Sequence, residues 1–98
     1  MTHRLRLLQS ARTEINEAAE WYETQTEGMG PEFLRDFDIV AERLKRYPEA
    51  YQIARGTVRR APMGRFPYNI YYRLYGDEIV MLACVHQKRD PSYWLSRV

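Results

Sequence analysis

Features that define several common protein classes are scarce in this chain of 98 residues. No apolar run approaches the roughly 20 residues that a membrane-spanning helix needs. The first residues also lack the apolar stretch and the small-residue cleavage site of a signal peptide, so we expect a cytoplasmic protein. The single cysteine, Cys84, excludes an internal disulfide and lies in an apolar segment, which predicts a small buried side chain rather than a reactive thiol.

Standard catalytic signatures are missing as well. The chain has no glycine-rich phosphate loop, no Gly-x-Ser-x-Gly elbow and no cluster of cysteine or histidine for a metal. His3 and His86 are the only imidazoles, and His3 lies in a terminal segment. We therefore expect no cofactor and no metal ion.

Acidic residues are absent between Tyr51 and Arg73, a segment that holds five arginines. Residues 1–49 carry seven basic and ten acidic side chains (−3), and residues 50–98 carry eight basic and three acidic ones (+5). This asymmetry favours an acidic partner for the second half, either a nucleic acid or an acidic protein segment. The alternative is a solvated sheet edge on which arginines deter aggregation.

The overall composition, 45% hydrophobic and 29% charged, is that of an ordinary globular protein, and the length predicts one domain over residues 1–98. A short strand over 4–8 precedes a helix over 11–26, with Ser10 as the N-cap and Glu14 in a solvated acidic stripe. A glycine-rich stop at 27–30 leads to a second helix over 31–46, which Tyr47 and Pro48 end.

The second half reads as strands. Residues 53 and 57–61 fit one strand broken at Gly56, and apolar runs at 66–74 and 79–85 flank a Gly76-Asp77 turn typical of a β-hairpin. This turn pairs Tyr71 with Leu82 and Asn69 with Cys84. A short helix over 91–97 follows, with Asp90 as its N-cap.

These elements predict an α+β fold of two layers in the order β-α-α-β-β-β(-α). The helical hairpin packs on one face of a small, mainly antiparallel four-stranded sheet, and the first strand lies beside the last. The opposite face is expected to stay uncovered. On that face, or near its end, we expect the following partner-binding or target-binding residues: Arg59, Arg60, Arg65, Asn69, Tyr71, Arg73, His86, Lys88, Arg89 and Trp94.

Arginine holds phosphates in a bidentate manner and aromatic rings stack on bases, so this surface suits RNA. The same groups are also open to structural interpretations. Tyr71 packs at a sheet edge, His86 caps a strand, and Trp94 fastens the terminal helix to the core.

The segments AAEWYETQTEGMGPEFLRDF (18–37), RFPYNIYY (65–72) and HQKRDPSYW (86–94), with the break at Tyr47-Pro48, resemble the RelE/ParE toxin superfamily of bacterial type II toxin–antitoxin modules. The resemblance spans nearly the whole chain in the right order. It implies a small growth-inhibiting toxin, encoded beside an antitoxin that wraps it and often represses the shared promoter through a ribbon-helix-helix or similar DNA-binding part.

Within this superfamily, RelE-like members cut messenger RNA on the ribosome and ParE-like members poison DNA gyrase. The resemblance implies that a nuclease would use Arg60, Arg89 and Tyr93, with a further arginine where this chain has the neutral Asn69, and the residues themselves add His86 to this candidate set. The RFPY and RDPxxW patterns are more ParE-like, so we favour a toxin that acts by binding and commit to no catalytic residue.

Three hypotheses stay open. The first is a ParE-like toxin directed at gyrase, the second is a ribosome-dependent endoribonuclease that needs no metal, and the third is a non-toxic basic interaction module. In the first two, we expect the antitoxin to direct acidic side chains toward Arg59, Arg60 or Arg73.

Overall fold

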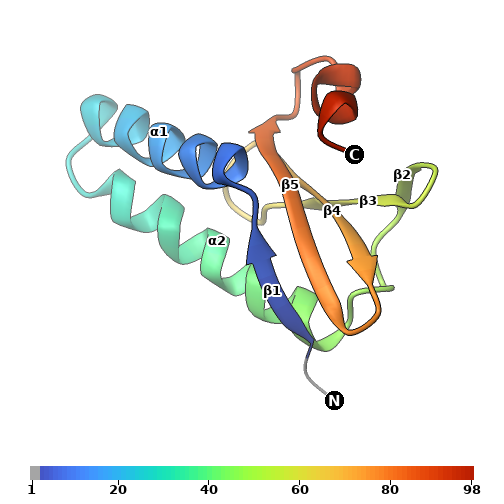
Figure 1. Ribbon diagram of the computed structural model, residues 1–98. Coiled ribbons are helices and arrows are strands. Elements are labelled where there is room, and N and C mark those ends of the chain that lie inside the picture. Colours follow the sequence, from blue (N-terminus) through green and yellow to red (C-terminus); the bar gives the residue numbers. More distant parts are fainter. Residues whose placement is uncertain (1–2) are drawn as a thin grey trace.

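A computed structural model describes residues 3–98 (Figure 1). Its elements, in chain order, are β1 (Arg4–Leu7), α1 (Gln9–Gln25), α2 (Met29–Arg46), β2 (Ile53–Arg55), β3 (Val58–Pro62), β4 (Tyr68–Tyr75), β5 (Glu78–His86) and the 3₁₀ helix η1 (Pro91–Arg97). The two long helices form an antiparallel hairpin on one side of the sheet, and η1 lies beyond the end of β5. None of the helices in residues 3–98 has the length and apolar character needed to cross a membrane.

The sheet has the order β1-β5-β4-β3-β2, with β1 parallel to β5 and every other pair antiparallel. This arrangement confirms the predicted α+β fold and the position of the first strand beside the last. The sheet has five strands rather than four, because Gly56 adopts a left-handed conformation (φ 56°) and folds the predicted broken strand into the hairpin β2–β3.

The helices begin earlier than predicted. The N-cap of α1 is Leu8, without a side-chain hydrogen bond, and Ser10 lies inside the helix, so the prediction of Ser10 as the cap is wrong. Gly28, with φ 90°, is the N-cap of α2, which therefore starts before Pro31. The terminal helix has the predicted bounds, and the Asp90 side chain accepts a hydrogen bond from the Ser92 N–H as expected.

A β-bulge divides the long hairpin. The register set by the Gly76-Asp77 turn holds as predicted as far as Tyr72 opposite Met81. Beyond this pair the register shifts by one residue, so that Tyr71 faces Ala83 rather than Leu82 and Asn69 faces Val85 rather than Cys84. A bulge inserts one residue into one strand and turns the following side chains to the opposite faces.

The bulge reassigns the second half of β5. Cys84 belongs to the core under the long helices, whereas Ala83 and Val85 belong to a second cluster on the other face of the sheet. His86, opposite Tyr68, lies on the helix side, so its predicted position beside Tyr71 and Arg73 is wrong. An apolar strand carries no alternation from which this exchange could be predicted.

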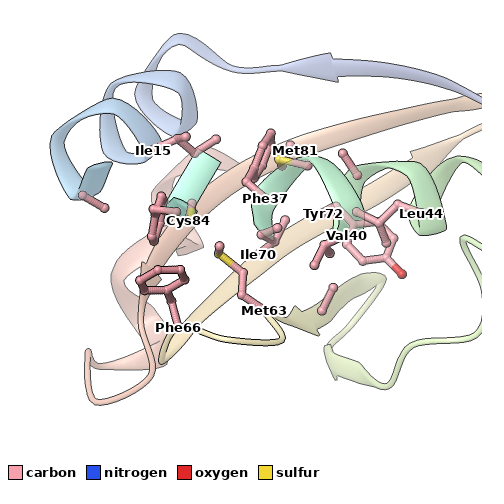
Figure 2. Packing of buried hydrophobic residues seen from close by; sticks show 14 of the residues in the cluster. Ile15, Phe37, Val40, Leu44, Met63, Phe66, Ile70, Tyr72, Met81 and Cys84 are labelled. Atoms are coloured by element: carbon pink, nitrogen blue, oxygen red, sulfur yellow. The ribbon is translucent and has the colours of Figure 1, made fainter. Parts of the chain in front are cut away.

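The main core lies between the helical hairpin and the sheet (Figure 2). Its helix residues include Ile15, Phe37, Val40 and Leu44, and its sheet residues include Ile70, Tyr72, Met81 and Cys84. The smaller second cluster lies on the opposite face, where Trp94 of η1 packs on Tyr71 with ring centroids 5.2 Å apart. The expectation that this chain leaves the second face uncovered is therefore wrong around Tyr71, because η1 covers it.

Candidate partner-binding surfaces

The face of the sheet opposite the two long helices carries two of the predicted arginines. We call the surface formed by Arg60, Arg73 and the neighbouring Tyr75 the arginine face. Arg60 lies opposite Tyr71 in the register of β3 and β4, and Arg73 follows Tyr71 by two residues on the same strand. Because side chains alternate along a strand, Arg60 and Arg73 point to the same side as Tyr71.

Both arginines on this face are only weakly engaged. The Arg73 guanidinium lies over the Tyr75 ring, with its Cζ 4.9 Å from the ring centroid, and its buried Nε has no hydrogen-bond partner among residues 3–98. Arg60 Nη2 donates to Gln52 Oε1 at 3.4 Å, a long and exposed contact. The arginine face therefore has cationic groups available for an acidic partner.

Two other predicted arginines bind their own chain instead. Arg59 donates from Nη1 to the backbone carbonyls of Tyr51 (2.6 Å) and Glu49 (3.2 Å), which holds the segment after α2 against the sheet. Arg65 Nη1 pairs with Glu32 Oε2 of α2 at 2.5 Å. These contacts give Arg59 and Arg65 structural roles and leave the arginine face to Arg60 and Arg73.

A groove of about 290 Å³ lies between α1, the end of β5 and η1. We call it the tail groove, and its lining includes Glu17, Trp21, Tyr68, His86, Arg89 and Tyr93. The Tyr68 and His86 rings meet edge to face with centroids 5.3 Å apart, and the Arg89 Cζ lies 4.3 Å from the centre of the Tyr93 ring. Burial raises the pKa of Tyr68, so this phenol is neutral at physiological pH.

An ion pair holds the groove together. Arg97 of η1 donates from Nη1 and Nη2 to the two carboxylate oxygens of Glu14 on α1, at 2.9 and 3.0 Å. The hydrogen bond to Glu14 raises the pKa of Arg97 further. Glu14 was predicted to be a solvated residue and is instead a largely buried partner of the C-terminal segment.

The structure separates the four residues predicted for a nuclease. His86, Arg89 and Tyr93 lie in the tail groove on the helix side, whereas Arg60 lies on the opposite face of the sheet. Lys88 is exposed in the turn after β5, where its N–H donates to His86 Nδ1 at 3.1 Å. Asn69 and Trp94 are buried, at 7% and 2% exposure, so neither is available to a partner in this conformation.

The sequence did not predict that Trp21 and Tyr68 line the tail groove. Trp21 was assigned to the apolar stripe of α1, yet its side chain is 55% exposed at the rim of the groove. A signal was present, because Ala18 and Ala19 already supply the small buried residues of this helix turn, and Trp21 lies two positions beyond Ala19. Tyr68 was assigned to the core and is only half-buried.

Comparisons with known proteins agree with this architecture. Residues 5–91 match the model of a family described as the ParE toxin of the type II toxin–antitoxin system parDE. A chain of the chromosomal ParDE system from P. aeruginosa is similar in structure, with a TM-score of 0.65, 16% identity, and coverage of 87% of this chain and 96% of the other. A chain of the RelBE2 toxin–antitoxin complex from Mycobacterium tuberculosis gives a TM-score of 0.65 and 16% identity, with coverage of 88% and 99%.

No curated protein matches the sequence significantly. The two similar structures are distant in sequence and show the fold alone. The family model matches residues 5–91, which is most of the chain, and therefore shows the family as well as the fold. This chain belongs to the ParE toxin family of type II toxin–antitoxin systems.

Proposed function

We propose that this chain stops bacterial growth by binding an essential cytoplasmic target, that the target is DNA gyrase, and that a cognate antitoxin neutralises it. The separation of the charged groups on the two faces of the sheet is the observation that favours binding of a target over cleavage of RNA. His86, Arg89 and Tyr93 lie on one side of the sheet and Arg60 on the other, so they do not converge on one scissile phosphate. Membership of the ParE family supports the choice of gyrase.

Controlled expression without the antitoxin tests this proposal. We expect growth arrest and a DNA-damage response, because a poisoned gyrase leaves broken DNA. Cells that grow normally under strong expression would contradict the proposal and favour a non-toxic interaction module.

A ribosome-dependent endoribonuclease is a second candidate, favoured by the cluster of His86, Arg89 and Tyr93 in one groove. A histidine beside an arginine is able to move a proton and offset charge at phosphorus. Sequencing the 5′ ends of transcripts after induction separates the two candidates. Cuts at fixed codon positions would support the nuclease, and their absence during growth arrest would support the binding toxin.

We also propose that the antitoxin places acidic side chains on the arginine face. Arg60 and Arg73 point to the same side and are only weakly engaged, while Arg59 and Arg65 already bind their own chain. The ParDE and RelBE2 structures are toxin–antitoxin systems, which supports a partner of this kind. Opposite charges across an interface raise both the specificity and the rate of association.

A further inference from the structure

We propose that the tail groove binds the protein target by accepting one aromatic side chain of that target between Trp21 and Tyr93. The inference deepens the proposed function and rests on it. It assigns the target to this groove and the antitoxin to the arginine face on the other side of the sheet.

The size of the groove favours a single large side chain. Its volume, about 290 Å³, lies at the lower limit of sites for whole small molecules, which start near roughly 300 Å³. The two rings come from different elements, Trp21 from α1 and Tyr93 from η1, with the end of β5 between these elements. They are 55% and 37% exposed, a large aromatic surface for a chain that buries its other tryptophan.

The residue types are those that dominate protein interfaces. Tryptophan, tyrosine and arginine are enriched among the contacts that contribute most to binding, above all where they line a pocket. Trp21, Tyr93 and Arg89 supply all three in one groove. The guanidinium groups of Arg89 and Arg97 both lie over the Tyr93 ring, with their Cζ atoms 4.3 and 4.8 Å from its centroid, so a partner that reaches Tyr93 also meets a positive charge.

The charges around the groove favour a polypeptide over a nucleic acid. Its α1 side carries Glu17, followed by the exposed Glu20, and its other side carries Arg89, next to the exposed Lys88. A phosphate backbone would be attracted to one side and repelled by the other. A protein segment satisfies both sides if a basic residue faces Glu17 and an acidic residue faces Arg89 beside the aromatic anchor.

The groove is formed before a partner arrives. Glu14 and Arg97 join α1 to η1 by two hydrogen bonds of 2.9 and 3.0 Å. Trp94 of η1 packs on Tyr71, on the face of the sheet opposite the long helices. A preformed site loses less conformational entropy when it binds. The wall that carries Tyr93 is thus held in place by an ion pair within the chain, in which Glu14 also lines the groove.

The test compares toxicity among surface variants expressed at equal levels. Trp21→Ala removes one ring, and Glu17→Lys reverses the charge of the α1 wall at an exposed position. Tyr47→Ala and Glu27→Lys are the matched controls, because Tyr47 is 64% exposed and Glu27 is exposed, and neither lines the groove. Circular dichroism and thermal unfolding establish that each purified variant is folded.

We expect Trp21→Ala and Glu17→Lys each to need at least tenfold more protein than the wild type for half-maximal growth inhibition, and both controls to stay within twofold. We also expect Trp21→Ala to bind the purified cognate antitoxin as tightly as the wild type. Equal toxicity of Trp21→Ala and the wild type would overturn the inference while leaving the proposed function intact. A non-toxic wild type would instead contradict the proposed function itself.

Two further outcomes would overturn the choice of partner. A tenfold loss of antitoxin affinity in Trp21→Ala would show that the groove binds the antitoxin. Binding of a fluorescent single-stranded RNA decamer that Trp21→Ala abolishes would show that the groove stacks bases.

Discussion

Glu14 and Arg97 lie 83 residues apart in the sequence and together cap the edge of β5 that β1 leaves free. β1 pairs with β5 only as far as Leu7 opposite Met81. Beyond that point Glu14 Oε1 accepts the Cys84 N–H at 3.0 Å, and Arg97 Nη1 donates to the Leu82 carbonyl at 3.1 Å. The ion pair therefore satisfies backbone groups that a longer strand would otherwise pair.

We predict that Glu14→Ala destabilises the fold by about 3 kcal/mol, because it leaves a largely buried guanidinium and the Cys84 N–H without partners. Glu17→Ala, an exposed change one helical turn away, should alter the free energy of unfolding by less than about 0.5 kcal/mol. Urea unfolding measures both. If Glu14→Ala and Glu17→Ala change the free energy of unfolding by the same amount, the ion pair contributes nothing to stability.

The double variant Glu14→Ala/Arg97→Ala should lose less free energy of unfolding than the two single variants lose in total, because each single change already breaks the same ion pair. A double-mutant cycle in urea gives this coupling free energy. Strict additivity would contradict a direct interaction between the two side chains.

We predict that the protein loses stability at alkaline pH because of the buried Tyr72 hydroxyl. Its hydroxyl donates to the Pro48 carbonyl at 2.6 Å, and burial raises its pKa from 10.0 to about 12. The folded state then holds this proton more tightly than the unfolded state. The stability that the protonated Tyr72 hydroxyl contributes is therefore complete below pH 10 and is lost as the pH rises toward 12. Burial also raises the pKa of Cys84 to about 12, from 9.0, which starts the decline near pH 9.

Tyr72→Phe should reduce the pH dependence of the free energy of unfolding above pH 10. It should also cost about 1–2 kcal/mol at pH 7, because the Pro48 carbonyl loses its donor. Tyr75→Phe, at a 49% exposed position, is the control and should change neither quantity. An unaltered alkaline slope in Tyr72→Phe would show that this hydroxyl does not titrate late.

Asp36 fixes the connection between β3 and β4. This carboxylate is 4% exposed on α2, and its Oδ2 accepts the Arg65 N–H at 2.9 Å. We predict that Asp36→Ala costs about 2 kcal/mol, since the hydrogen bond involves a charged group. Asp38→Ala, exposed on the same helix, should stay within about 0.5 kcal/mol in the same urea titration.

The arginine face leads to a prediction about antitoxin affinity. Arg60→Glu/Arg73→Glu should weaken binding of the purified cognate antitoxin by at least tenfold, about 1.4 kcal/mol, because acidic contacts become repulsive. Arg12→Glu, exposed on α1, is the control. Isothermal titration calorimetry measures the affinities, and an unchanged affinity in the double variant would remove this face from the antitoxin site.

The sequence predicts this fold where its signals are local. The turn at Gly76-Asp77 sets the register correctly as far as Tyr72 opposite Met81, and the α-α hairpin and the terminal helix follow from helical spacing and from Gly and Pro. The bulge after Met81 was not predictable, because β5 is apolar on both faces and a shift by one residue leaves its pattern unchanged.

Contacts between distant residues escaped prediction for another reason. Glu14 and Arg97 show no local pattern that links them, and a glutamate in an acidic stripe is typical of a solvated helix face. The displaced position of His86 follows from the bulge, and with it the grouping of His86, Arg89 and Tyr93 apart from Arg60. The structural interpretation of Trp94, that it fastens η1 to the sheet, is confirmed.

A supercoiling assay measures whether this toxin acts by binding gyrase. Purified wild-type protein is titrated into a reaction of DNA gyrase with relaxed plasmid and ATP, with protein premixed with cognate antitoxin as the control. We predict dose-dependent loss of supercoiling that the antitoxin reverses. Full supercoiling at toxin concentrations far above that of gyrase, when the same protein arrests growth in cells, would show that gyrase is not the target.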